Sequence, residues 1–281
     1  MIVHLIDGTY ELFRHFYGIR RFKKTDPPYG AVSGVLRTVL KMLDDGATHI
    51  GVATDHIIES FRNGLWRDYK TGAGIEPVLR SQFIPLEEAL AAMGVAVWPM
   101  IELEADDALA SAAHLAAQDE RVEKVCIWTP DKDLAQCVVG ERVVQIDGRR
   151  GLIRDANAIR AKFGVAPEHI PDYLALVGDA ADGYPGIKGF GPKTAAQLIN
   201  RYGRLEDFPI EILKEDNLAS ALLFKDLATL RIDAPLFADV EQLRWRGATA
   251  SFRSVAEKID DASLATRVLN LEKRLPTSRT K

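Results

Sequence analysis

The first half of the chain alternates short apolar runs with stretches in which apolar residues recur at helical spacing. Runs and stretches of these lengths are typical of a parallel sheet with crossover helices. One helix is predicted over "AVSGVLRTVLKMLDDG", which stops at Gly46, and another over "IPLEEALAAMG", which stops at Gly94. The candidate strands are Ile2–Asp7, His49–Asp55, Val95–Met100, Val125–Asp131 and Arg142–Asp147.

The pattern changes from about Phe163 onward. The sequence there predicts short helices joined by Gly and Pro turns, without an obvious strand. We therefore predict an α/β domain over residues 1–165 and an all-helical domain over residues 166–281. A length of 281 residues agrees with two domains.

Composition places the chain among ordinary globular proteins, with 47% hydrophobic and 27% charged residues. No apolar run reaches the length of a membrane span, and the opening "MIVHLIDG" lacks the basic leader of a signal peptide. The two cysteines, Cys126 and Cys137, form neither a zinc spacing nor a CxxC motif. We therefore expect a monomeric protein in a reducing, cytoplasmic setting, without membrane contact.

Acidic residues follow four of the five candidate strands. Two end the first and second strands, three follow the third in "IELEADDALA", two lie at and after the end of the fourth, and two more come from "LVGDAADGYPG" in the helical half. Because ligand sites in open α/β sheets lie outside the carboxyl ends of the strands, we expect these groups to meet at one edge. The set comprises Asp7, Asp55, Glu104, Asp106, Asp107, Asp131, Asp133, Asp179 and Asp182.

Each of these residues also has a plain structural alternative. A single Asp after a strand is commonly a turn former or a helix N-cap, and Asp106 and Asp107 suit the positive end of the helix that follows. Capping does not explain the whole set, because like charges about 4 Å apart repel by roughly 4 kcal/mol at an effective dielectric near 20. Hard divalent cations such as Mg²⁺ bind carboxylate oxygens and would offset this repulsion. Two such ions about 4 Å apart can activate a water and stabilise the leaving oxygen of a phosphodiester.

The overall charge does not exclude a polyanionic substrate. The chain carries 36 basic and 40 acidic residues, for a net charge of −4. Setting aside the nine clustered acidic residues leaves 31 acidic against 36 basic residues. Local basic patches can therefore bind a polyanion in spite of the acidic total.

The segment "GIKGFGPKTAAQLI", Gly186 to Ile199, resembles a nucleotide-binding P-loop only superficially, because Gly191 is followed by Pro192 instead of Lys. A helix-hairpin-helix is the better interpretation, with glycines in the turn and amides at the next helix start facing a phosphate. The alternative is an ordinary connection between two helices with solvated lysines. The candidate DNA-backbone contacts here are Lys188, Gly189, Gly191, Lys193 and Thr194.

Five motifs, in matching order over roughly residues 1–255, resemble the 5′ nuclease family: the flap endonucleases and the 5′–3′ exonuclease domain of bacterial DNA polymerase I. They are "LIDGTYELFRHFYG", "VATDHIIESFRNGLWRDYK", "LEADDALA", "TPDKDLAQ" and "LALVGDAADGYPGIKGFGPKTAAQLI". The resemblance implies a PIN-like parallel sheet flanked by helices, followed by an all-helical region with a helix-hairpin-helix. It also implies two-metal hydrolysis of DNA at 5′ flaps, forks or 5′ ends, with Mg²⁺ or Mn²⁺.

By matching positions, the resemblance implies that all nine clustered acidic residues bind metal and that Asp107 is essential for catalysis. Arg14 and Lys70 match residues that steady the scissile phosphate, and Tyr69 matches an aromatic on which a terminal base stacks. Arg80 is the next cation after Lys70 and is a further candidate DNA contact. The family's hairpin also often holds K⁺ on backbone carbonyls, which implies a site made by Gly186, Ile187, Gly189 and Gly191.

The segment "TGAGIEP" after Lys70 is less basic than is usual in the family, so the balance between exonuclease and endonuclease activity stays open. Gly183 and Tyr184 stand where an Asn and an apolar residue are usual. Two alternatives to a nuclease acting on DNA are a non-catalytic or weakly active junction-binding protein and a PIN-like ribonuclease. A DNA polymerase or a ligase is a candidate protein partner.

Overall fold

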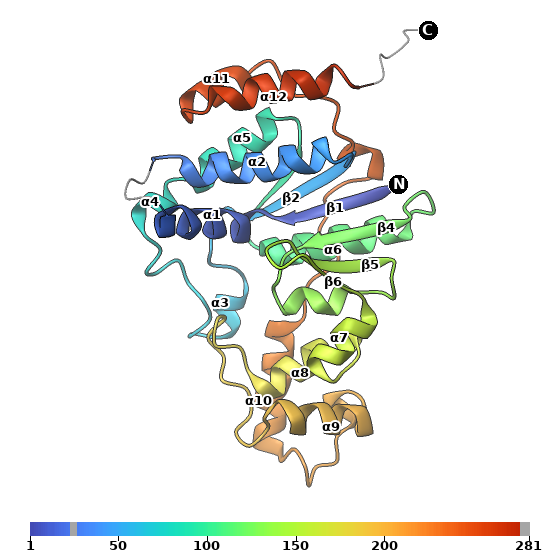
Figure 1. The fold of residues 1–281 in the computed structure, drawn as a ribbon. Helices are drawn as coiled ribbons and strands as arrows, with labels where there is room; N and C mark the ends of the chain where they lie inside the picture. Colours follow the sequence, from blue (N-terminus) through green and yellow to red (C-terminus); the bar gives the residue numbers. More distant parts are fainter. Residues whose placement is uncertain (23–26, 276–281) are drawn as a thin grey trace.

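A six-stranded sheet forms the centre of the molecule in this computed structural model, which describes residues 1–22 and 27–275 (Figure 1). The strand order is β3-β2-β1-β4-β5-β6; the first five strands run parallel, and β6 runs antiparallel to β5. The strands are β1 (Ile2–Asp7), β2 (His49–Asp55), β3 (Ala96–Met100), β4 (Lys124–Trp128), β5 (Val143–Asp147) and β6 (Leu152–Arg154).

The prediction of five parallel strands is confirmed, with two differences. Strand β4 ends at Trp128 and not at Asp131, because Pro130 has no N–H with which to continue the ladder, so Asp131 lies in the turn that follows. Strand β6 was not predicted; its three residues are too short for a periodic signal, although "DGRR" before it is typical of a hairpin turn.

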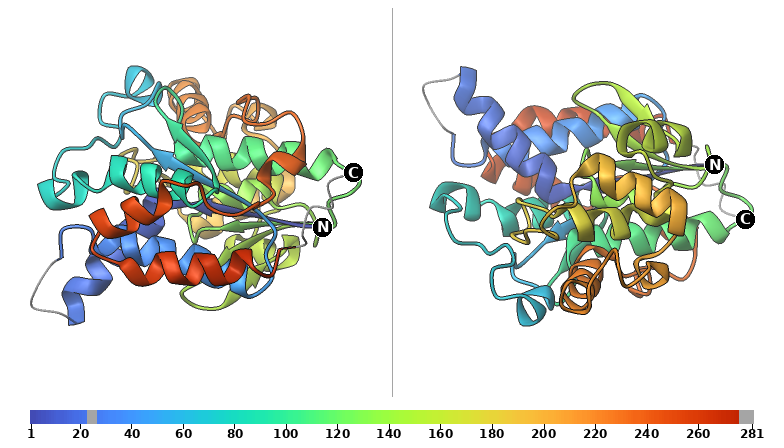
Figure 2. Two further views of the ribbon diagram at one scale, coloured as in Figure 1. Left: turned by 90° about the horizontal axis from the view of Figure 1, so that it is seen from above. Right: turned by 90° about the horizontal axis from the view of Figure 1, so that it is seen from below.

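Helices cover both faces of the sheet. The alternation of side chains along β1 directs Ile6 to the face covered by α1, α2 and α5, and Val3 and Leu5 to the face covered by α6. Figure 2 shows α6 on the opposite side of the sheet from α1, α2 and α12. The helices of the first half are α1 (Gly8–Phe22), α2 (Gly30–Asp44), α3 (Arg62–Leu65), α4 (Pro77–Arg80), α5 (Phe83–Ala92) and α6 (Ala105–Gln118).

The strand order reverses at β1. The chain moves from β1 outward to β2 and β3, then returns through α6 to β4 on the other side of β1. Ligands of open α/β sheets bind at such a switch point, outside the carboxyl ends of the strands. This is the edge at which Asp7 and Asp55 end β1 and β2.

The helical region after β6 has a core of its own, which confirms the predicted change of fold class. Buried residues of α7 to α10 pack together, with Tyr184 and Phe224 near the centre, and Tyr69 from the first half joins them. Helices α8 and α9 are joined by the glycine-rich loop of residues 178–191. The helices are α7 (Ala156–Phe163), α8 (Ile170–Val177), α9 (Pro192–Tyr202), α10 (Glu215–Ala228), α11 (Phe252–Lys258) and α12 (Ala262–Glu272), with short 3-10 helices at Asp133–Cys137, Pro167–His169, Leu205–Asp207 and Val240–Leu243.

Helices α11 and α12 do not pack with the other helices of the second half. They lie over α2 and α5, and their buried residues, such as Phe252 and Leu264, belong to the core on that face of the sheet (Figure 1). The connection is anchored by Trp245, whose indole N–H donates to the Met93 carbonyl over 2.8 Å. The predicted second domain, residues 166–281, therefore includes two helices that pack on the first core. The boundary at residue 165 stays a proposal for the chain up to α10.

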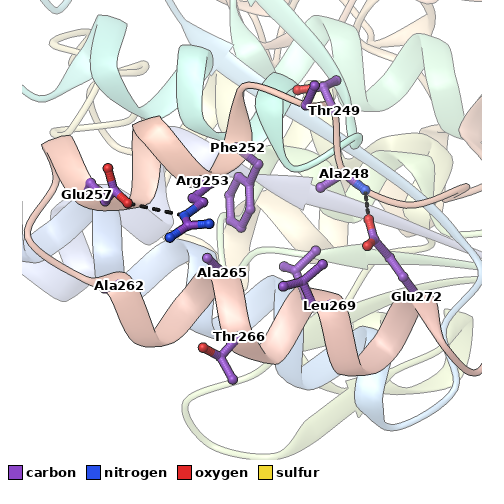
Figure 3. Close-up of a pocket in the computed structure, with 12 residues that line it drawn as sticks. Ala248, Thr249, Phe252, Arg253, Glu257, Ala262, Ala265, Thr266, Leu269 and Glu272 are labelled. Atoms are coloured by element: carbon purple, nitrogen blue, oxygen red, sulfur yellow. Dashed lines mark hydrogen bonds and ion pairs between the residues drawn. The ribbon is translucent and has the colours of Figure 1, made fainter.

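A groove of about 630 Å³ runs between α11 and α12, and the Ala248 N–H donates to Glu272 at one end of it (Figure 3). It lies far from the strand ends that carry the acidic residues, so it is not part of the predicted site. Across residues 1–22 and 27–275, no helix has both the length and the apolar character needed to cross a bilayer.

The packing of α12 can be tested with two leucines of the same helix. Leu264 is fully buried, so Leu264→Ala should lower the free energy of unfolding by about 2–5 kcal/mol. Leu269 is 56% exposed, and Leu269→Ala should change it by about 0.5 kcal/mol or less. Urea unfolding monitored by circular dichroism provides the measurement. Equal effects of the two substitutions would contradict the docking of α12.

Candidate active site

Strands β1 and β2 present Asp7 and Asp55 at their last positions. Asp7 is buried; its two oxygens accept hydrogen bonds from the Tyr10 N–H at 2.8 Å and the Thr129 hydroxyl at 3.0 Å. Asp55 accepts a hydrogen bond from the Ala105 N–H at 2.8 Å, at the start of α6. The two carboxylates are therefore held by backbone amides in the first turns of α1 and α6.

The start of α6 adds Glu104 and Asp106. Glu104 is buried and accepts hydrogen bonds from the Ser60 hydroxyl at 2.6 Å and the Tyr69 hydroxyl at 3.3 Å. It also contacts two cations: Lys70 Nζ lies 2.7 Å from Glu104 Oε2, and the Arg62 guanidinium lies 3.3 Å from Oε1. Asp106 lines the same cleft as Asp7 and Asp55.

A second acidic group lies beside the first. One carboxylate oxygen from each of Asp133, Asp179 and Asp182 lies within 4.8 Å of the others, and all three residues are buried. Asp131 stands between the two groups: it lines the cleft with Asp7 and accepts a hydrogen bond from the Asp133 N–H at 3.1 Å. The structure therefore brings together eight of the nine predicted acidic residues.

The cleft between these residues has a volume of about 390 Å³. Carboxylates and Lys70 line it together with the rings of Tyr10 and Phe13 and the side chains of Ile58 and Ile75. A cleft lined by both charged and apolar side chains suits a ligand that has both a phosphate and a flat apolar face, such as a nucleotide.

Burial and the charges of neighbouring carboxylates raise the pKa values of several of these acidic side chains. Burial raises the pKa of Asp7 from its ordinary 3.8 to about 7, and the charges of Asp55 and Asp131 add to the shift. Burial likewise raises the pKa of Asp182 to about 6, although Lys70 opposes the change. The pKa values of Asp106 and Asp133 rise well above the ordinary value, through burial first and the charge of Asp131 second. Several carboxylate oxygens this close together suit hard divalent cations, whose charge would favour the ionised form of each carboxylate.

Two lysines partly neutralise the acidic residues. Besides Glu104, Lys70 Nζ lies 3.5 Å from Asp182, and Lys132 Nζ lies 2.6 Å from Asp179. Although burial favours the neutral amine, Glu104 and Asp182 raise the pKa of Lys70 well above its ordinary value. Two lysines against eight carboxylates leave a strong negative excess, which favours cation binding.

Asp107 is placed elsewhere, contrary to the prediction. It is fully buried, and Arg62 donates to its two oxygens at 2.7 and 2.8 Å. The backbone N–H groups of Glu104 and Arg231 donate to the same carboxylate at 2.9 and 2.8 Å. With both oxygens occupied by donors, Asp107 holds the chain together and is not positioned to bind metal.

Tyr69 and Arg14 also differ from their predicted roles. Tyr69 is 3% exposed and packs in the helical core, so its ring is not accessible to a terminal base. Arg14 lies one helical turn after Tyr10, where its guanidinium pairs with Glu11 and contacts Thr38, and it does not line the cleft. Lys70 alone of the two predicted phosphate-steadying cations reaches the carboxylates.

The hairpin residues are exposed as expected. Lys188, Lys193 and Thr194 lie on the surface of the loop and the first turn of α9. The N-cap residue Gly191 provides no side-chain cap, so the first amides of α9 are open to a ligand. Gly189 has a φ of +97°, which favours glycine, and Arg80 is exposed at the end of α4.

The sequence analysis missed three residues of the site. Tyr10 and Phe13 are three positions apart after Asp7, a helical spacing that places both rings on one face. Lys132 lies between Asp131 and Asp133, where its position alone indicated a counter-charge. The pairing of Arg62 with Asp107 spans 45 residues and left no local signal.

Comparisons with known proteins identify the family to which the chain belongs. The family model described as 5′-3′ exonuclease, N-terminal resolvase-like domain, matches residues 2–164, and that of the 5′-3′ exonuclease, C-terminal SAM fold, matches residues 165–251. A 5′-3′ exonuclease of Aquifex aeolicus is 34% identical over 211 residues, 73% of this chain and 71% of that protein. The chain therefore belongs to the 5′-3′ exonuclease family, a family of nucleases.

Two further proteins define the extent of the similarity. DNA polymerase I of Pseudomonas aeruginosa is 33% identical over 259 residues, which are 85% of this chain but only 28% of the polymerase. The chain thus spans little more than a quarter of the length of that relative. A crystal structure of the bacteriophage T5 D15 flap endonuclease with DNA and metal ions shares the fold, with a TM-score of 0.62 at 17% identity, over 98% of this chain and 100% of the other.

The raised pKa of Asp7 predicts how pH affects stability without metal. Because its folded pKa of about 7 exceeds the ordinary 3.8, the ionised group destabilises the fold above pH 7, and this penalty disappears as pH falls towards 4. Asp7→Asn should therefore raise the melting temperature in EDTA at about pH 8, with the gain vanishing near pH 4. The exposed Asp45→Asn serves as the control, and a gain that does not depend on pH would contradict the interpretation.

The structural role of Asp107 is testable as well. Asp107→Ala leaves Arg62 buried without its partner, so we expect a loss of about 3–5 kcal/mol in the free energy of unfolding. The double variant Arg62→Met/Asp107→Leu should recover much of this loss, because it removes both charges. Urea unfolding measures both effects. A stable Asp107→Ala protein that fails to cleave DNA would instead restore the predicted catalytic role.

Proposed function

We propose that the protein is a structure-specific 5′ nuclease that hydrolyses phosphodiester bonds of DNA at 5′ flaps, forks or 5′ ends. The observation that carries this proposal is the cleft at the switch point of the sheet, which five carboxylates and Lys70 line and which Glu104, Asp133 and Asp179 adjoin. Membership of the 5′-3′ exonuclease family supports it independently. The T5 structure with DNA and metal ions supports DNA as the substrate class.

The two acidic groups would hold two divalent cations. Asp7, Asp55, Asp106 and Asp131, with Glu104 behind them, suit one ion, and Asp133, Asp179 and Asp182 suit the other. Mg²⁺ or Mn²⁺ bound there would activate a water molecule and stabilise the leaving oxygen. The protein itself contributes the positions of the ligands, which the hydrogen bonds from Tyr10, Thr129 and Ala105 fix in advance.

Lys70 is the residue best placed to bind the scissile phosphate. It stays charged at all relevant pH values, and it lines the cleft from a segment tied to the second group by the hydrogen bond from the Lys70 N–H to the Asp182 carbonyl at 2.9 Å. When cations neutralise Glu104 and Asp182, its ammonium is released from these partners to donate to a phosphate oxygen. In this proposal Arg14 attracts the strand from outside the cleft and does not touch the reacting phosphate.

Tyr10 and Phe13 would receive the terminal base. Both rings line the cleft together with the carboxylates, so a base could stack on them while its phosphate contacts Lys70. This assigns to Tyr10 the stacking role first predicted for the buried Tyr69.

The helical region would hold the duplex. Lys188, Lys193 and Thr194, with the open amides of α9, suit phosphate contacts that carry no sequence preference. Arg80 would contribute a further contact from α4. A K⁺ ion on the carbonyls of residues 186–191 stays a prediction of the family resemblance. A DNA polymerase or ligase as a partner that acts on the same intermediates also stays a prediction.

Cleavage of labelled DNA tests the proposal. The protein should cut a 5′-flap duplex in Mg²⁺ or Mn²⁺. Asp131→Ala should slow cleavage at least about 100-fold, because even outer partners of metal ligands contribute about 10- to 100-fold. Asp131 is exposed and its carboxylate accepts one hydrogen bond, so the variant should fold and still bind the flap in Ca²⁺. The exposed Asp45→Ala should cleave like the parent protein.

The same assay separates the alternatives. Tight binding of flap DNA without turnover in either metal would favour a junction-binding protein. Faster cleavage of an RNA flap than of a DNA flap would favour a ribonuclease. Full activity of Asp131→Ala would reject the acidic cleft as the active site.

A further inference from the structure

The loop that carries Asp179 and Asp182 contains an unusual pair, Gly183 and Tyr184. Tyr184 is tied to Asp179 by two backbone hydrogen bonds, of 2.9 and 3.1 Å. Gly183 has a φ of +86°, and a Cβ at this position would lie 2.0 Å from the Asp68 carbonyl oxygen. Glycine is therefore required here for the segment before Lys70 to approach the acidic group closely.

The Tyr184 ring is held in one position. It is 1% exposed and stacks on Phe224, with ring centroids 5.6 Å apart and planes inclined at 26°. Phe224 in turn contacts Trp66 edge-on at 5.2 Å, and the Trp66 indole N–H donates to the Gly183 carbonyl at 3.1 Å. These contacts fix the direction of the Tyr184 hydroxyl as well.

The hydroxyl has no hydrogen-bond partner. Among the described residues, four buried side-chain polar atoms lack one, and two of these belong to His49 and His169, each close to a carboxylate at 3.5 or 3.7 Å. The other two are the Tyr184 hydroxyl and Asp133 Oδ1. A buried donor and a buried acceptor that both lack a partner destabilise a fold unless a further group binds between them.

The two atoms belong to one environment. Burial raises the pKa of Tyr184 well above its ordinary value, so the hydroxyl keeps its proton, and Asp133 exerts the largest charge effect on it, ahead of Asp182 and Asp179. The backbone pair between Tyr184 and Asp179 places Tyr184 beside the second acidic group, because one Asp179 oxygen lies within 4.8 Å of oxygens of Asp133 and Asp182. An apolar residue at this position would offer no donor.

We propose that Tyr184 is a positioning residue of the second cation site. Its O–H would donate to a water molecule held in the outer shell of a bound cation, and that water would donate to Asp133 Oδ1, so that both unpartnered atoms would be satisfied only when the ion is bound. The inference rests on the proposed function, since it needs a divalent cation at Asp133, Asp179 and Asp182. Mg²⁺ and Mn²⁺ commonly keep several waters, which such groups orient.

Tyr184→Phe removes the hydroxyl and keeps the ring, so the variant should fold. Without metal its melting temperature should equal or exceed that of the parent, because the deleted group had no partner. Calorimetric titration with Mn²⁺ should show about 10-fold weaker binding at one site, with the other unchanged. The Mg²⁺ concentration for half-maximal flap cleavage should rise similarly, with the rate restored at saturating Mg²⁺. Tyr202→Phe, the same change on α9, should behave like the parent.

The outcomes distinguish this inference from the proposed function. If the parent binds Mn²⁺ at two sites and Tyr184→Phe binds it equally well, the role of Tyr184 is rejected while the nuclease proposal stands. A marked loss of metal-free stability in Tyr184→Phe would also reject it, because the hydroxyl would then already have a partner. If the parent binds no Mn²⁺, the metal-dependent function itself fails.

Discussion

The burial of several carboxylates close to one another is the constraint on which the rest of this structure depends. Eight acidic side chains from five segments of the chain occupy one edge of the sheet, and burial raises the pKa values of five of them, Asp7, Asp55, Asp106, Asp133 and Asp182. The fold tolerates them because backbone amides and two lysines hold them in place, while the large hydrophobic cores on both faces of the sheet supply the stability that the acidic edge lacks. The candidate active site thus destabilises the fold locally, and the surrounding hydrophobic cores compensate for this loss.

Arg62 connects the two halves of the molecule at this edge. Its guanidinium pairs with Asp107 and lies 3.3 Å from Glu104, and it donates to the Leu227 and Thr229 carbonyls at the end of α10. One fully buried cation therefore fixes the start of α6, which carries first-group carboxylates, against the helical region, which carries second-group carboxylates. The relative placement of the two acidic groups is determined partly by this contact.

Much of the fold was predictable because buried parallel strands appear as continuous apolar runs and their carboxyl ends share an edge. The same reasoning failed for Asp107: a spacing of three from Glu104 indicates one helix face but not which partner that face meets, and Arg62 lies 45 residues away. The stacking role predicted for Tyr69 differs from the structure for a related reason, since nothing near Tyr69 in sequence revealed the helical core that covers it. Strand β6 and the return of α11 and α12 to the first core depend on contacts between distant residues, which periodicity does not report.

The return of α11 and α12 has a consequence for biosynthesis. The outer faces of α2 and α5 are apolar and complete their burial only against residues 252–271. During synthesis on the ribosome, the apolar faces of α2 and α5 therefore stay exposed to solvent until residues 252–271 have been made. Nascent or prematurely terminated chains would therefore be the aggregation-prone forms of this protein, and chaperone binding would be concentrated on the α2–α5 surface.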